Sequence, residues 1–79
     1  MKPNEVMRAL VDTYPEGQRA LSRKLGRSPG WFSSTLTRGS VPRLDTVAAV
    51  ADACGYEVVV REKEGGRVLG KVDPPTPRP

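Results

Sequence analysis

The sequence predicts a small, mainly α-helical domain followed by a β-hairpin. Apolar residues recur at helical spacing in four segments between residues 5 and 54, and glycine or proline separates these segments. After Gly55 the apolar period changes to two, which is typical of strands. The 79 residues are close to the lower limit for one self-sufficient core, so association with a second copy is a common remedy at this size.

The first two helices are expected at residues 5–14 and 18–25. In the first, Asn4 is available as a cap, Pro15 ends the segment, and apolar residues follow the helical period at Val6, Met7, Leu10, Val11 and Tyr14. The second presents Leu21 and Leu25 to the core, and Gly26 suits the turn that follows.

A third helix is expected at residues 28–37, where Ser28 would cap the free amide groups and Pro29 would occupy the first helical position. Phe32 and Leu36 lie four residues apart and therefore share the inner face. The fourth helix is expected at residues 44–54, ended by Gly55. Predicted core residues are Leu21, Leu25, Phe32, Leu36, Val47 and Ala51, together with Cys54 as a small core side chain.

The hairpin is expected at residues 56–72, with Gly65-Gly66 as a two-residue turn. A two-stranded hairpin is marginal in water, so it must pack on the helices or extend a sheet of a second chain. Residues 1–72 thus form one domain, and the proline-rich residues 73–79 are expected to be disordered or extended. The predicted dimerisation residues are Tyr56, Val58, Val60, Val68 and Val72.

The composition argues against several classes of function. With no histidine and a single cysteine, Cys54, the chain lacks an internal disulfide, an ordinary zinc ligand set and an activated nucleophile. We therefore expect no enzymatic activity, no metal and no cofactor. The sequence contains neither a signal-peptide layout nor an apolar run that could cross a bilayer, so a cytoplasmic protein without a membrane partner is expected.

Positive charge is concentrated in one part of the chain. Residues 17–43 carry six basic and no acidic side chains, although the net charge of the whole chain is only +4. A long stretch without acids favours a polyanionic partner, and the alternative is chance clustering on a solvated face.

The third predicted helix lies inside this stretch, and its outer face carries small hydroxyls. A helix that enters the major groove, about 12 Å wide, gains from short side chains and from the absence of carboxylates. Ser33, Ser34 and Thr37 are therefore candidate DNA contacts. Ser28 is a further candidate, although its first expected role is to cap the helix.

The order of four segments, GQRALSRKLG, SPGWFSS, a glycine-containing loop ending in Pro42, and RLDTVAAVADACG, resembles the Cro and phage-repressor type of helix-turn-helix protein, the XRE family. The resemblance covers about half of the chain. It implies a four-helix bundle of the phage-repressor-like helix-turn-helix type, in which helix 28–37 reads the major groove. The implied protein is a prokaryotic or phage transcriptional repressor, found at the nucleoid when bound to DNA. The implied assembly is a homodimer on a roughly palindromic operator, with recognition helices about 34 Å apart.

The resemblance also implies roles for single residues. Gln18 matches a glutamine that holds a phosphate at the start of helix two, and Thr37 and Arg43 fall where the family contacts the DNA backbone. Arg27 and Arg38 flank helix three and could bind phosphate or a guanine edge, or remain solvated surface residues.

Two departures from the family pattern concern the start and the end of helix three. The positions that most often read bases are here Pro29 and Gly30, which have no side-chain hydrogen-bonding groups. Readout would then shift to Ser34, Arg38 or Trp31, whose indole could meet a thymine methyl group or simply pack on the core. Gly39 comes one residue later than in most relatives, which would place Arg38 on the helix itself.

Two other functions remain open at this stage. The chain could be an antitoxin or accessory factor that binds DNA weakly and holds a partner protein through the hairpin. It could also be an interaction module that has kept the fold and lost DNA binding, which the Pro29-Gly30 pair favours and the acid-free stretch disfavours.

Overall fold

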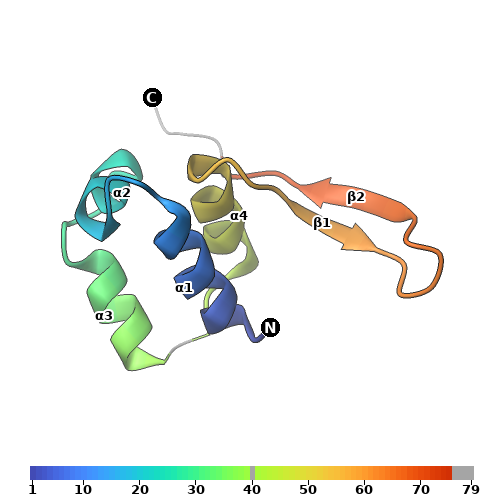
Figure 1. Ribbon diagram of the computed structural model, residues 1–79, viewed down its shortest axis with the longest axis horizontal. Helices are drawn as coiled ribbons and strands as arrows, with labels where there is room; N and C mark the ends of the chain where they lie inside the picture. Colours follow the sequence, from blue (N-terminus) through green and yellow to red (C-terminus); the bar gives the residue numbers. More distant parts are fainter. Residues whose placement is uncertain (40, 76–79) are drawn as a thin grey trace.

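A computed structural model describes residues 1–39 and 41–75 and shows four helices followed by a hairpin (Figure 1). The helices are α1 (Pro3–Thr13), α2 (Gln18–Lys24), α3 (Trp31–Arg38) and α4 (Leu44–Ala53). The antiparallel strands β1 (Val58–Arg61) and β2 (Val68–Val72) follow them. The predicted mainly α class with a C-terminal hairpin is confirmed. Within the described residues, every helix is too short or too polar to cross a bilayer.

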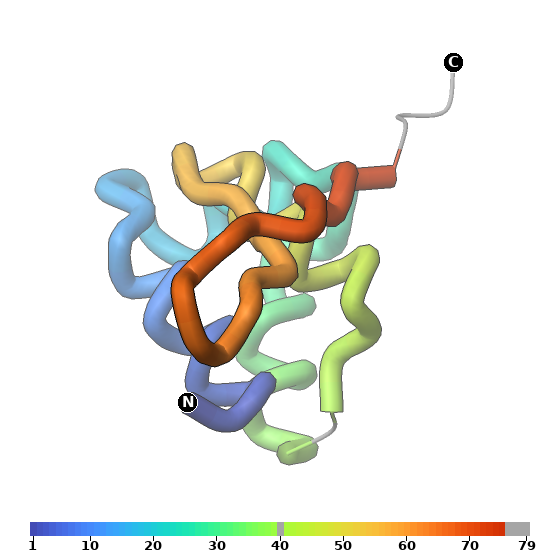
Figure 2. Tube along the Cα trace, turned by 90° about the vertical axis from the view of Figure 1, so that its right-hand side faces the viewer, coloured from blue at the N-terminus to red at the C-terminus, as the bar shows by residue number. Residues whose placement is uncertain are grey.

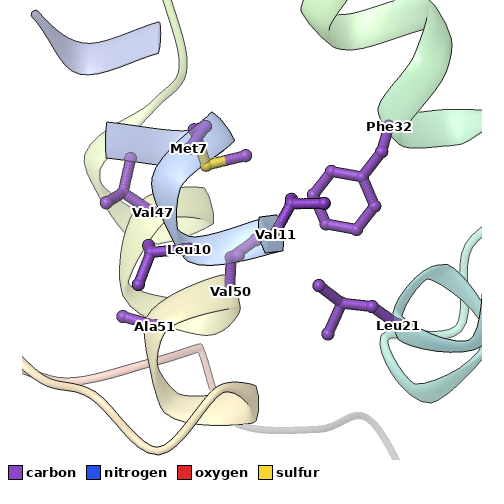
Figure 3. Packing of buried hydrophobic residues seen from close by; sticks show 8 residues of the cluster. All are labelled: Met7, Leu10, Val11, Leu21, Phe32, Val47, Val50 and Ala51. Carbon is purple, nitrogen blue, oxygen red and sulfur yellow. The ribbon is translucent and has the colours of Figure 1, made fainter. Parts of the chain in front are cut away.

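The core lies between the four helices, each of which contributes at least one side chain (Figure 3). Phe32 of α3 and Leu21 of α2 are completely buried, at 0% exposure. Leu25 and Leu36 are half-buried against this cluster. The buried apolar residues are Met7, Leu10, Val11, Leu21, Phe32, Val47, Ala48, Val50 and Ala51.

The start of α1 differs from the prediction. The helix begins at Pro3, with Lys2 in the cap position, and Asn4 lies inside the first turn. Instead of an asparagine cap, the backbone N–H of Lys2 donates to Glu5 Oε2 at 3.3 Å. Proline suits the first helical position because its missing N–H would have no partner there.

The predicted start of α3 is wrong by three residues. Residues 28–31 form a turn in which the Trp31 N–H donates to the Ser28 carbonyl at 3.0 Å, and helix geometry begins at Trp31. Gly30, with φ −91° and ψ 6°, has the angles of the third residue of a type I turn. Ser28 therefore does not cap α3. Serine followed by proline is as favourable at the start of a type I turn as at a helix start, so the local sequence did not distinguish them.

Left-handed glycines end α2 and α4 in the same way. Gly26 has φ 71° and Gly55 has φ 84°. The residue after each glycine donates its N–H back into the helix, from Arg27 to the Ser22 carbonyl and from Tyr56 to the Ala51 carbonyl, both at 2.8 Å. These are Schellman motifs. The helices accordingly end one residue earlier than expected, at Lys24 and Ala53, and α1 likewise ends at Thr13.

The hairpin turn is longer than predicted. The Glu62 N–H donates to the Arg67 carbonyl at 2.9 Å, so the chain reverses over four intervening residues instead of the two glycines alone. The strands pair Val58 with Val72 and Val60 with Gly70, with a bulge at Leu69, which has no partner. A two-residue turn would shift this register by one and place Asp73 opposite Val58. The apolar pair at the base of the hairpin therefore sets the register.

The hairpin contacts the helices through its base. Val58 packs against the core cluster, and Val72 is half-buried. Beyond them the hairpin projects from the helical body (Figures 1 and 2). It points away from α3, which lies at the other end of the long axis in Figure 1.

Residues 73–75 of the tail are neither helix nor strand. Pro74 is half-buried. Together with Pro75 it lines a hollow of about 660 Å³ between the end of α2, Trp31 and α4. The expected disorder of residues 76–79 lies outside the described residues.

Candidate nucleic-acid interface

The outer face of α3 is a stripe of short polar side chains. Ser33, Ser34, Thr37 and Arg38 are exposed, whereas Phe32 on the inner face is buried. The exposed residues are contiguous because positions three and four apart are neighbours on a helix. Arg38 is the last helical residue and Gly39 follows it with φ 66°, as the late glycine predicts. The helix therefore offers three hydroxyls and one guanidinium, with no carboxylate among its own residues.

Arg27 and Trp31 meet at the start of α3. The guanidinium carbon lies 5.1 Å from the centroid of the indole ring, within the range of a cation–π contact. The indole in turn packs edge-on against Phe32, with ring centroids 4.7 Å apart and an interplanar angle of 69°. Trp31 is thus half-buried against the core and holds an exposed arginine beside α3.

Arg43 occupies the cap position of α4 and forms an ion pair with Asp45, 3.2 Å between Nη2 and Oδ2. Its side chain is 83% exposed. An exposed pair of this kind contributes little to stability, so the guanidinium can leave the carboxylate for a phosphate at small cost. The Asp45 carboxylate also accepts a hydrogen bond from the Thr46 N–H at 2.9 Å. This bond holds the carboxylate against the first turn of α4.

The long polar side chains of α2 differ in their contacts. Gln18, Arg19 and Arg23 are exposed, and Gln18 is the first helical residue. Lys24 instead joins two helix ends, because its Nζ donates to the Ala53 carbonyl of α4 at 3.3 Å. The same ammonium lies 5.6 Å from the ring centroid of Tyr14. Sequence reasoning missed this role, because the contact joins two residues that are 29 positions apart.

Two exposed apolar residues near the end of α3 were missed by sequence reasoning. Val41 is 78% exposed and Leu44 is 58% exposed. The spacing of Leu44 from Val47 and Ala48 places it on the apolar stripe of α4. The helix begins at Leu44, however, so no preceding turn covers this side chain. Arg43, which lies between them in the sequence, is exposed as well.

The five predicted dimerisation residues do not share one surface. By the pairing register, Val58, Val60 and Val72 lie on one face of the hairpin, while Val68 lies opposite Arg61 on the other face. Tyr56 precedes the strand and is 55% exposed. Val59 and Leu69, at 41% and 84% exposure, are further apolar residues on this hairpin.

Cys54 follows α4 and is half-buried against the core. Burial raises the pKa of its thiol, although a hydrogen bond with Thr13 and the positive charge of Lys24 act in the opposite direction. A raised pKa disfavours the thiolate and hence reactivity. Within residues 1–39 and 41–75, histidine, cysteine and carboxylate side chains form no group of three that could bind a metal.

Comparison with models of protein families, with curated proteins and with solved structures found no match to this chain.

Proposed function

We propose that the protein is a sequence-specific DNA-binding transcriptional regulator of the phage-repressor-like helix-turn-helix type. In this proposal α2 and α3 form the helix-turn-helix and α3 enters the major groove. The observation that carries the proposal is the exposed stripe of Ser33, Ser34, Thr37 and Arg38. It lies within a 27-residue stretch that has six basic and no acidic side chains.

The chemistry of this stripe suits a groove lined by phosphates. Short hydroxyl side chains allow the helix backbone to approach the base edges, and the absence of carboxylates avoids repulsion. Hydroxyls accept and donate and so discriminate bases poorly. Discrimination would therefore depend mostly on Arg38, which can bind the O6 and N7 atoms of guanine.

The turn at residues 28–31 supports a role for the exposed residues of α3 in base contacts and for its neighbours in phosphate contacts. Pro29 and Gly30 lie before the helix, so their lack of hydrogen-bonding side chains removes nothing from its exposed stripe. Arg27 precedes this turn and is held by Trp31 at the edge of α3, where it would bind phosphate. Arg43 and Gln18 are exposed and would add further phosphate contacts.

The proposed assembly is a homodimer that binds a roughly palindromic operator and represses by occluding the promoter. The position of the hairpin supports this assembly. It lies at the opposite end of the molecule from α3 (Figure 1), so contact between hairpins would leave both α3 helices accessible.

Fluorescence anisotropy with a random-sequence duplex tests DNA binding. The logarithm of the affinity should fall linearly with the logarithm of the salt concentration. Arg38→Glu should weaken binding by roughly tenfold or more and reduce the salt slope. The matched control is Arg67→Glu, the same charge change in the hairpin, which should weaken binding far less.

Two results would contradict the proposal. One is an equal loss of affinity in the two variants, because binding would then depend on net charge and not on α3. The other is no binding at low salt. Selection of an operator from random sequence would follow a positive result.

A second candidate function is that of an antitoxin or accessory factor that binds a different protein. The projecting hairpin favours it, because Val60, Val68 and Leu69 are exposed apolar side chains. Absence of both DNA binding and self-association would shift the proposal to this alternative.

A further inference from the structure

The hairpin leaves one edge of β1 without a neighbouring strand. In the described part of the chain the sheet has two strands only, and each has one unpaired edge. Val59 and Val60, at 41% and 49% exposure, lie on this strand beyond the part that packs on the helices. An exposed apolar edge of this kind is a template for pairing with another strand.

The sequence along this edge is complementary to itself. Residues 57–61 read Glu-Val-Val-Val-Arg. If two copies run antiparallel about a two-fold axis at Val59, each Glu57 lies opposite Arg61 of the second copy. The same register places Val58 opposite Val60 of the second copy and the two Val59 side chains opposite each other. In this register every charged residue lies opposite a residue of opposite charge, and every valine lies opposite a valine.

We infer that two copies of this chain join through β1 in this register, forming a four-stranded antiparallel sheet in the order β2, β1, β1, β2. The inference makes the homodimer of the proposed function specific and does not require DNA binding. Glu57 and Arg61 are both exposed in one copy, so their pairing needs no rearrangement of the core. Val58 already contacts the helical body, which makes the joined sheet continuous with both cores.

The edge of β2 is less suitable, although Arg67 and Asp73 would also pair about a two-fold axis at Gly70. The bulge at Leu69 interrupts the regular backbone of β2, and bulges protect edges from pairing. Gly70 would contribute no side chain at the centre of such an interface. Pro74 comes directly after Asp73 and cannot donate a hydrogen bond to a partner strand.

Charge reversal provides the test, by analytical ultracentrifugation without DNA. Glu57→Arg places two arginines opposite each other, and Arg61→Glu places two glutamates opposite each other. Each single variant should therefore have a dimer dissociation constant raised by roughly tenfold or more. A mixture of the two variants pairs opposite charges again and should associate as tightly as the native chain. Glu64→Arg, a charge reversal in the hairpin loop, is the matched control and should leave association unchanged.

Three outcomes would overturn the inference. A native chain that stays monomeric at high concentration is the first. Single variants that dimerise like the native chain are the second. The third is a loss of dimer on Asp73→Arg without a loss on Glu57→Arg, which would assign the interface to β2. Unchanged helical circular dichroism of each variant shows that the fold is intact, and the absence of DNA keeps this result independent of the anisotropy experiment.

Discussion

The guanidinium of Arg27 lies over the indole of Trp31, 5.1 Å from the ring centroid, while the same indole packs edge-on against the buried ring of Phe32. This chain of contacts joins an exposed cation to the core. It fixes the connection between α2 and α3, and with it the position of a basic group next to the exposed stripe of α3.

Replacing Trp31 and replacing Arg27 should have different consequences. Trp31→Ala removes a half-buried aromatic ring and should lower the free energy of unfolding by roughly 2 kcal/mol, less than the ~3–5 kcal/mol of a fully buried ring. Arg27→Ala loses an exposed cation–π contact and should cost at most about 1 kcal/mol. In DNA binding, Arg27→Ala should weaken affinity at low salt while the protein stays folded. Urea denaturation followed by circular dichroism, beside the anisotropy titration, separates the two effects, and a larger loss of stability in Arg27→Ala would contradict this account.

Ser22→Ala should stabilise the protein. Ser22 is completely buried in α2, and its hydroxyl has no hydrogen-bond partner within the described residues. Alanine removes the unsatisfied group, which costs about 1–3 kcal/mol when buried, and has the higher helix propensity. Ser33→Ala, on the exposed face of α3, is the control and gains only the propensity term of about 0.5 kcal/mol. Equal midpoints of urea unfolding in the two variants would show that the Ser22 hydroxyl is satisfied in solution.

Gly26→Ala should destabilise the protein, whereas Gly30→Ala should not. At Gly26, φ is 71°, so alanine there should cost about 1–2 kcal/mol. At Gly30, φ is −91°, which alanine adopts readily. A Cβ atom at either position would meet no atom within 4 Å, so backbone conformation alone separates the two cases. Gly30→Ala should be neutral or stabilise by up to about 1 kcal/mol through the unfolded chain, as thermal unfolding would show. Destabilisation by both substitutions to the same extent would contradict the turn at residues 28–31.

Cys54 should react slowly with thiol reagents. Burial raises the pKa of its thiol, so at a given pH the folded protein holds less thiolate than the unfolded chain. Alkylation by iodoacetamide at pH 8.5 should therefore be slower in the folded protein than in urea. The neutral thiol contributes stability that is complete below the ordinary pKa of 9.0 and is lost as the pH rises through the raised value. Faster alkylation in the folded state would contradict this direction.

The sequence predicted that the helices exist and where α2 and α4 begin, but it did not predict where α1 and α3 begin. Apolar spacing located all four, because burying one face of a helix requires that period. The exact ends of a helix depend on whether the flanking residues continue the helix or form a turn. The spacing of apolar residues does not distinguish these two outcomes. Ser28 and Pro29 suit a helix start and a turn equally well, and Gly30 continued the turn. At Gly26 and Gly55 the left-handed backbone was predictable, since glycine adopts it with little strain.

The candidate interface was predictable where it depended on one helix and unpredictable where it depended on two elements. Ser33, Ser34, Thr37 and Arg38 lie on the exposed face that the positions of Phe32 and Leu36 predict. In contrast, the contact of Lys24 with the Ala53 carbonyl and the seating of Pro74 beside α2 and α4 join distant parts of the chain. Contacts between distant residues produce no periodic pattern in the sequence, so they could not be predicted from it.

The sequence by itself determined the class of fold, the acid-free basic stretch and the polar outer face of α3, because composition and helical period are properties of neighbouring residues. Only the tertiary structure decided the hairpin register, since the pairing of Val58 with Val72 at the helical body outweighs the turn preference of two glycines. It also decided that α3 and the hairpin lie at opposite ends of the molecule (Figure 1). That separation leaves both surfaces accessible, because neither α3 nor the outer part of the hairpin covers the other.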